Sequence, residues 1–381
     1  MAEAVLLYGA SAGDADLRHH VPLAVGDPFL FAELDGRPHV VTSSLERDRI
    51  AEAVPAAEVH TFDRHGYDEV LAEGGSIGEV EREVCARAVE ALGVRAAVVP
   101  PTFPVALADR LRHAGIELRV DEATFSDRRR VKHEAELAGV RNAQAAAEHG
   151  MGAARQLLRD ATARDGVLHR GPLPLTAEDV RERIRASCAA RAPRAPADLI
   201  VAAGAQGAAG HDPGSGPLPE GVPIIVDLWP RDEASGCHAD MTRTFVVGTV
   251  PDWVAEQHRL CLEALEASAA EVRAGVMAVD VYARACDVFE AAGHPTQRTK
   301  APGEVLLEGF FHSLGHGVGL DVHEAPLLGR AGRTPLLAGD VLAVEPGTYR
   351  RGEGGVRLED LLLVTADGHE RLTDFPYDLA P

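Results

Sequence analysis

Two pairs of acidic segments in the second half of the chain decide its fold: IIVDLWP (224–230) with ADMTRTFVVG (239–248), and LAVEPG (342–347) with VRLEDLLLVT (356–365). In each pair an apolar run reaches a carboxylate, and the next run carries a second one. Asp227 and Asp240 lie 13 positions apart, and Glu345 and Glu359 lie 14 apart. Short apolar runs separated by turn residues are typical of paired strands. The spacing therefore predicts two similar hairpins, an internal two-fold repeat with four carboxylates between its halves.

Four carboxylates in one apolar pocket would repel one another, and each would lose its hydration. Two divalent cations would balance the four charges, and oxygen ligands with one imidazole suit manganese, zinc, cobalt or iron. The alternative is that each acid pairs with a nearby arginine, for which Arg243 and Arg357 are available. Buried ion pairs are poor stabilisers, so four of them in repeated positions are the less favoured interpretation.

The segment FFHSLGHGVGLDVHEAP (310–326) supplies three histidines between the two hairpins: His312, His316 and His323. The glycines beside them permit close approach of the backbone. This density of histidines indicates a metal or catalytic site, and the absence of an H-E-x-x-H motif excludes a zincin. His211 lies in a glycine-rich loop (204–221) before the first hairpin; taken alone, it fits an exposed loop residue.

Outward from these motifs, the second part of the chain alternates helical and strand patterns. We expect strands at 223–228, 240–247, 341–345 and 356–364, and helices after Thr176 and at 252–274 and 279–292. The first part predicts an α/β layer with strands at 5–8, 29–34, 39–42, 95–99 and 117–120, and helices at 44–53, 78–92 and 104–113. The domain boundary is expected near residue 127, giving domains 1–127 and 128–381. The run Arg128–Arg130 is interpreted as a solvated linker.

Composition limits the partners that this chain can have. The 381 residues carry a formal net charge of −21, which argues against nucleic acid and anionic membranes as partners. The five cysteines include no C-x-x-C pair, so a reducing compartment is expected. The N-terminus lacks the pattern of a signal peptide, and no apolar run is long enough to span a bilayer. We therefore expect a cytoplasmic protein.

The quoted motifs resemble the superfamily of methionine aminopeptidase, aminopeptidase P, prolidase and creatinase. VDLWP, ADMTRTF, GHGVGLDVHE, AVEPGTY and GVRLED occur in the order of that family, over about residues 200–365. The resemblance implies an α/β (α+β) protein: a creatinase-like N-terminal α/β domain, then a pita-bread catalytic domain with a pseudo-two-fold repeat. The long N-terminal region is similar to the aminopeptidase P and prolidase branch.

The resemblance also implies roles for nine residues. Two divalent metal ions, with manganese expected first and cobalt, zinc or iron as alternatives, would be held by five ligands: Asp227, Asp240, His316, Glu345 and Glu359. Asp240 and Glu359 would bridge both ions. Glu345 would also accept a proton from water, His323 would stabilise the oxyanion, and His211 would approach the residue after the scissile bond. His312 and Arg357 would contact the substrate.

The function predicted first is an Xaa-Pro aminopeptidase, a homodimer that acts on peptides. An Xaa-Pro dipeptidase (prolidase) is the alternative within the branch. Alternatives of another class are a creatinase-like C–N hydrolase and a non-catalytic binding protein; such relatives tend to lose metal ligands. The tip of the first hairpin is longer than usual in the family, and Cys237 stands where tyrosine is common.

Overall fold

The computed structural model describes residues 3–189 and 199–381. It divides into two compact units. The first unit is Met1–Arg129 together with Ala234–Gly236, and the second unit is Arg130–Glu233 together with Cys237–Pro381. No helix among the described residues is both long and apolar enough to cross a bilayer.

The first unit is built on a six-stranded mixed sheet with the order β4-β3-β2-β1-β5-β6. Its strands are β1 (Ala4–Gly9), β2 (Phe29–Leu34), β3 (Arg37–Thr42), β4 (Glu58–Thr61), β5 (Ala96–Val99) and β6 (Glu117–Val120). β2 and β3 form a hairpin whose two turn residues, Asp35 and Gly36, both have positive φ. Asp-Gly is the sequence that such a turn favours. The four-residue edge strand β4 was absent from the predicted strands.

Helices cover both faces of this sheet. They are α1 (Ala15–His20), α2 (Arg47–Ala53), the 3₁₀ turn η1 (Phe62–His65), α3 (Tyr67–Glu73), α4 (Ile77–Ala91), α5 (Val105–His113) and α6 (Glu122–Arg130). Leu6 of β1 packs into a core shared with α4 and α5, whereas its neighbour Leu7 packs with α1 and α2. Alternate residues of a strand point to opposite faces, so one strand serves two cores.

Among its described residues, the second unit holds four long helices and several antiparallel sheets. The helices are α7 (Glu134–Arg159), α8 (Ala177–Ala189), α9 (Asp252–Ala269) and α10 (Ala278–Ala291), with a 3₁₀ turn η2 (Gly204–Ala208). The strands are β7 (Thr162–Arg164), β8 (Val167–Arg170), β9 (Leu173–Pro174), β10 (Ile200–Ala203), β11 (Ile224–Leu228), β12 (Met241–Phe245), β13 (Gly315–Gly317), β14 (Glu324–Leu328), β15 (Val341–Val344), β16 (Gly347–Arg350), β17 (Gly354–Arg357), β18 (Asp360–Val364) and β19 (His369–Arg371).

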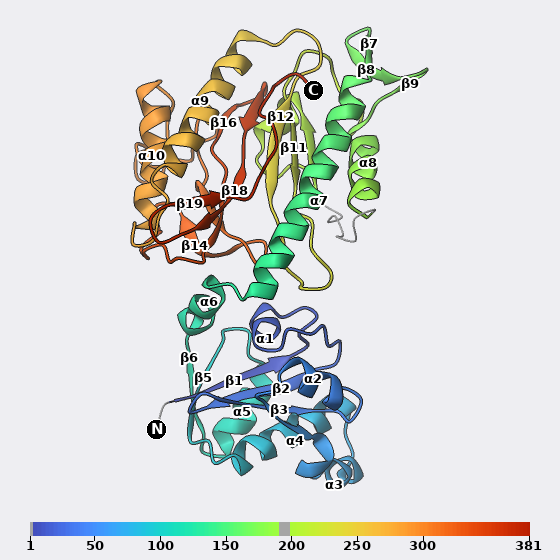
Figure 1. Ribbon diagram of the computed structural model, residues 1–381, viewed down its shortest axis with the longest axis vertical. Helices are drawn as coiled ribbons and strands as arrows, with labels where there is room; N and C mark the ends of the chain where they lie inside the picture. The colour runs from blue at the N-terminus through green and yellow to red at the C-terminus, as the bar shows by residue number, and fades with distance from the viewer. Residues whose placement is uncertain (1–2, 190–198) are drawn as a thin grey trace. The chain divides into compact units, whose positions relative to one another are not determined.

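Two similar halves make up this unit. One half packs α7 and α8 on the sheet β10-β11-β12, and the other packs α9 and α10 on a sheet with the order β14-β13-β15-β18-β19. Figure 1 shows the strands lying between the two helix pairs. The arrangement agrees with the predicted internal repeat, because each half contributes one hairpin with two of the four carboxylates.

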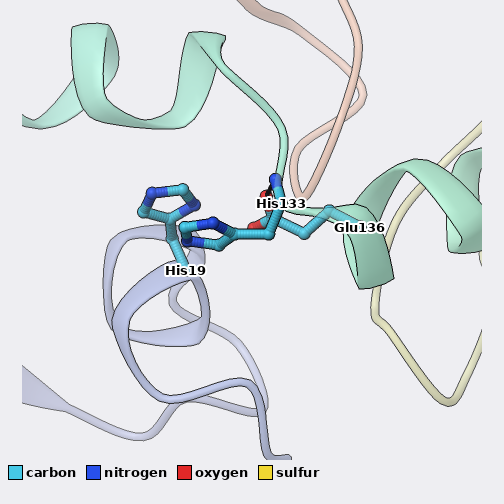
Figure 2. A group of neighbouring side chains, drawn as sticks. All are labelled: His19, His133 and Glu136. Carbon is cyan, nitrogen blue, oxygen red and sulfur yellow. Dashed lines mark hydrogen bonds between the residues drawn. The ribbon is translucent and has the colours of Figure 1, made fainter. Parts of the chain in front are cut away.

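The long helix α7 begins with a capping interaction. The backbone N–H of His133 donates to Oε2 of Glu136 at 2.8 Å, which uses one of the free N–H groups at the helix start. Figure 2 shows these two side chains at the first turn of α7; it also draws His19, a residue of the first unit.

The predicted strand 356–364 is in fact two strands, β17 and β18, interrupted at Leu358 and Glu359. The chain changes partner there: Arg357 pairs with Gly347 of β16, whereas Asp360 pairs with Val344 of β15. Glu345 lies in the matching gap between β15 and β16. The two glutamates therefore occupy one break shared by two ladders, where backbone pairing does not fix their side chains to one face.

The prediction of a solvated linker at Arg128–Arg130 was wrong. These arginines end α6, and each makes an ion pair inside its own unit. Arg128 bonds Glu33 at 2.9 Å and Arg129 bonds Asp16 at 2.8 Å. Arg130 is buried, and its guanidinium donates to both oxygens of Asp340 and to the carbonyl of Pro335. In the sequence the three arginines look like one charged run, whereas in the structure each side chain pairs with its own carboxylate.

Candidate active site

One cavity of about 960 Å³ in the second unit is lined by all nine residues to which the resemblance assigns a role. These nine residues on its wall are His211, Asp227, Asp240, His312, His316, His323, Glu345, Arg357 and Glu359. Its volume is in the range of small-molecule sites. Trp229, Phe311 and Leu327 add apolar surface to the same wall.

The first hairpin places two aspartates at the cavity. Asp227 lies in β11 opposite Thr242 of β12, and Asp240 directly precedes β12. Asp227 Oδ2 accepts from Nη2 of Arg357 at 2.6 Å. Its other oxygen, Oδ1, is buried and has no hydrogen-bond partner among the described residues. That oxygen belongs to a residue of the cavity wall and is free to act as a ligand atom.

The second hairpin contributes the two glutamates at the strand break. Glu359 Oε2 accepts from the hydroxyl of Thr242 at 2.8 Å, a contact between the two halves of the repeat. Glu345 Oε2 lies 3.9 Å from Nε of Arg357. The sequence analysis did not single out Thr242. It lies two residues after Asp240, so strand alternation would have placed it on the same face.

His316 is oriented as a ligand. Its Nδ1 donates to the carbonyl of Gly317 at 3.1 Å, which leaves the lone pair on Nε2. Nε2 lies 3.7 Å from Asp240 Oδ2 and 3.7 Å from Glu345 Oε1. Asp240, His316 and Glu359 each offer one ligand atom, and these atoms all lie within 4.8 Å of one another. Such an arrangement of oxygens around one imidazole can hold divalent cations.

The pKa values of these residues show that ionised carboxylates are unfavourable in the cluster when nothing balances their charge. Burial raises the pKa of Glu345 to about 8. Burial, and next the charge of Glu359, holds the pKa of Asp240 well above its usual range. Burial, and next Glu345, does the same to the pKa of Glu359. Burial lowers the pKa of His316 to about 4, so this ring is neutral. The donor set therefore fits bound cations, which would relieve the carboxylate repulsion and require a neutral imidazole.

The alternative interpretation, that each of the four carboxylates pairs with an arginine, holds for one of them. Arg357 makes its close ion pair with Asp227. Arg243 bonds instead to Asp360, at 2.9 Å, and to backbone carbonyls. Asp240, Glu345 and Glu359 thus have no ion pair with an arginine closer than 3.9 Å among the described residues.

His312 and Arg357 are joined by Tyr349 of β16, a residue to which we had assigned no role. Arg357 Nη1 donates to the Tyr349 hydroxyl at 2.9 Å, and that hydroxyl lies 3.0 Å from Nε2 of His312. Nδ1 of His312 bonds the carbonyl of Ser313 at 2.7 Å. Both ring nitrogens of His312 are therefore used within the protein. Burial lowers the pKa of this histidine to about 3, so it is neutral.

His211 and His323 complete the wall. The His323 ring lies 4.3 Å from the ring of His316, centroid to centroid. Burial, and next the neighbouring His211, lowers the pKa of His323. His211 is exposed on its loop, yet it lines the cavity. The loop passes close to β10 at Gly214, where an added Cβ would lie 1.8 Å from the carbonyl oxygen of Val201. Only glycine permits that approach.

Known proteins share both the sequence pattern and the fold. Residues 138–366 match the model of metallopeptidase family M24, which is more than half of the chain. The chain belongs to metallopeptidase family M24. The predicted superfamily and its fold are thereby confirmed.

Two relatives carry names that state an activity. The probable dipeptidase PepE of Mycobacterium tuberculosis is 34% identical over 205 residues, 54% of this chain and 51% of that protein. The Xaa-Pro dipeptidase of Pyrococcus horikoshii is 34% identical over 177 residues, 46% of each chain. The matched region thus spans about half the length of these two relatives. The structure of the Xaa-Pro dipeptidase from Bacillus anthracis has a TM-score of 0.80 at 23% identity and covers 99% of this chain and 94% of that one, which shows the fold.

Proposed function

We propose that this chain is a metal-dependent dipeptidase that hydrolyses the bond between an N-terminal residue and proline. The observation that carries the proposal is the convergence of nine side chains on one cavity, four of them carboxylates contributed by the two hairpins. Relatives named dipeptidase and Xaa-Pro dipeptidase support the alternative prediction over the aminopeptidase predicted first.

Asp227, Asp240, His316, Glu345 and Glu359 would hold two divalent cations, with manganese the first candidate. Asp240 and Glu359, one from each hairpin, would bring ligands from both halves of the repeat to the ions. Cations bound there lower the pKa of a water molecule and polarise a carbonyl group. The Thr242 hydroxyl orients Glu359, and Arg357 orients Asp227, so each of these two ligands has a fixed direction.

The side chains of the cavity supply the proton transfers. Glu345 accepts the proton of the attacking water: it lies on the cavity wall, and ligation of a cation would keep its carboxylate ionised. His323 donates a hydrogen bond to the oxyanion that forms on the scissile carbonyl. Proline nitrogen carries no hydrogen in the peptide, so it must gain a proton to leave. His211 and His323, which lie on the cavity wall, are the donors proposed for that step.

The test is a set of peptides at saturating manganese: Ala-Pro, Ala-Ala, Ala-Pro-Ala, Ala-Ala-Ala and Met-Ala-Ser. We expect Ala-Pro to be cleaved fastest and Ala-Pro-Ala poorly. Faster cleavage of Ala-Pro-Ala than of Ala-Pro would instead support an Xaa-Pro aminopeptidase, the function predicted first. Equal rates on Ala-Ala and Ala-Pro would refute the proline specificity, and cleavage of Met-Ala-Ser alone would assign a different branch.

A creatinase-like hydrolase or a binding protein remains the alternative of another class. Both would be expected to work without a metal pair, yet all five predicted ligands line the cavity. Elemental analysis of the purified protein separates the cases. About two divalent ions per chain support the peptidase, and a protein that is active on its substrate without them contradicts it.

A further inference from the structure

A group of side chains of the types that ligate metals lies in the first unit, at the edge of its sheet. His39 is on β3, and Glu58 and His60 are on the edge strand β4. The two strands are parallel, with His39 opposite Glu58 and Val41 opposite His60. Residues two apart on a strand share a face, so the three side chains gather on one face of the sheet.

The separations fit one tetrahedral ion. Glu58 Oε2 lies 3.6 Å from Nδ1 of His39, and Oε1 lies 3.2 Å from Nε2 of His60. One ligand atom from each residue can be chosen so that all three lie within 4.8 Å of one another. Ligand atoms at zinc distances and tetrahedral angles lie about 3.3 Å apart.

Two of the three ligand atoms are buried without a hydrogen bond. The His60 side chain is 5% exposed and the His39 side chain 14%, and neither His60 Nε2 nor His39 Nδ1 has a hydrogen-bond partner among the described residues. A buried polar atom that lacks a partner costs free energy. The Glu58 side chain is 59% exposed, which leaves the site open to an ion from solvent.

From these observations we propose a metal site formed by His39, Glu58 and His60, which takes one divalent cation of the zinc class. Two imidazoles and one carboxylate are a common zinc ligand set, with the fourth position open to water. The site is independent of the catalytic proposal, because none of its residues lines the cavity of the second unit. It would tie β4, the short edge strand, to β3.

Arg64 competes with the metal. Its Nη1 lies 2.6 Å from Nδ1 of His60, and because a guanidinium can only donate, the neutral ring then carries its hydrogen on Nε2. Metal binding at Nε2 requires the other tautomer, so the Arg64 contact must break. The Arg64 side chain is 64% exposed and can move into solvent. Removing this arginine should therefore strengthen binding.

The experiment is the zinc content of the full chain after dialysis against buffered Zn²⁺. We expect wild-type protein to retain one more zinc per chain than Glu58→Gln or His39→Gln/His60→Gln. Glu58→Gln changes an exposed residue, so it tests the site even if the buried double variant folds poorly. The matched control is Glu117→Gln, an exposed glutamate on β6 at the other sheet edge, which should bind as wild type does.

Arg64→Gln adds a test that a merely structural cluster would not pass. We expect zinc to bind this variant about tenfold more tightly, in the range seen for groups that contact metal ligands. Equal zinc contents of wild type, Glu58→Gln and the double histidine variant would overturn the proposal, as would weaker zinc binding by Arg64→Gln. Zinc retained in the second unit is common to all variants, so failure here leaves the peptidase proposal intact.

Discussion

His323 is the side chain whose removal best separates catalysis from metal binding. It lines the cavity beside His316, but its role in the proposed reaction is to stabilise the oxyanion. We expect His323→Ala to lower kcat by about 10²–10³-fold, the effect of losing one oxyanion donor. Steady-state kinetics on Ala-Pro, with metal content measured in parallel, checks this. A variant that loses its metals would mean that His323 is itself a ligand.

Arg130 gives a stability prediction for a single buried charge. Its ion pair with Asp340 is almost fully buried, with side chains 4% and 0% exposed. Arg130→Met would leave the Asp340 carboxylate without its cation, which typically costs about 3–5 kcal/mol. Arg128→Met is the control, because the half-buried pair with Glu33 should contribute less than about 1 kcal/mol. Urea unfolding of both variants measures the difference, and equal losses would contradict it.

The four carboxylates and the histidines of 310–326 stand out in the sequence as single residues, because carboxylates are rarely buried without a partner. His211 and Arg357 were assigned to the site only through the family resemblance. All nine predicted side chains line one cavity. Sequence reasoning missed Tyr349 and Thr242, which orient these side chains. Hydroxyl groups are common in sequences, and only the structure shows which groups they hydrogen-bond. The buried state of Arg130 was missed for a related reason: its carboxylate is 210 positions away in the chain.

At the scale of the element, β12 presents two buried threonines that differ in partner. Thr242 donates to the carboxylate of Glu359, whereas Thr244 exchanges hydrogen bonds with the backbone of Arg357. We expect Thr242→Val to weaken metal binding by about 10–100-fold, since it removes a contact that orients a ligand. Thr244→Val, buried in the same strand, should leave metal affinity near wild type. Metal titration of the chelated variants decides, and equal weakening in both would contradict the prediction.

Element boundaries were predicted well where a strand stays in one ladder and poorly where it changes partner. β2 and β6 match the expected ranges, 29–34 and 117–120. The interval 356–364 reads as one apolar strand, yet it is divided at Glu359 because its two ends pair with different strands. Alternation reports which face a residue occupies, whereas it does not report which neighbouring strand the residue pairs with.

For the whole molecule, the second unit brings buried carboxylates and buried histidines together, and the two kinds of group affect stability in opposite directions. His316 and His312 have pKa values of about 4 and about 3, below the ordinary 6.5. The folded protein therefore binds fewer protons at these rings than the unfolded chain does. Their contribution to stability is lost as pH falls below 6.5 and is complete above it.

Glu345 changes stability with pH in the opposite direction to the histidines. This difference defines a pH range in which Glu345, and not these two histidines, should affect the stability of the metal-free protein. Its pKa is raised from 4.5 to about 8, so the folded state keeps a proton that the unfolded chain has released. The stability that this carboxyl contributes is fully present below 4.5 and is lost as pH rises to about 8. Between pH 6.5 and 8 the two histidines no longer change, and we expect the Tm of the chelated protein to fall.

Bound cations should remove this fall in Tm, because a carboxylate that ligates a metal no longer needs the proton. They should also raise the Tm itself, because a ligand that binds only the folded state stabilises it. Calorimetry of chelated and manganese-loaded protein from pH 6.5 to 8 tests both effects. The chelated Glu345→Gln variant should show a smaller fall than chelated wild type, since the titrating group is gone. A fall of the same size in wild type and Glu345→Gln would show that the proton is held elsewhere, and the pKa assigned to Glu345 would be wrong.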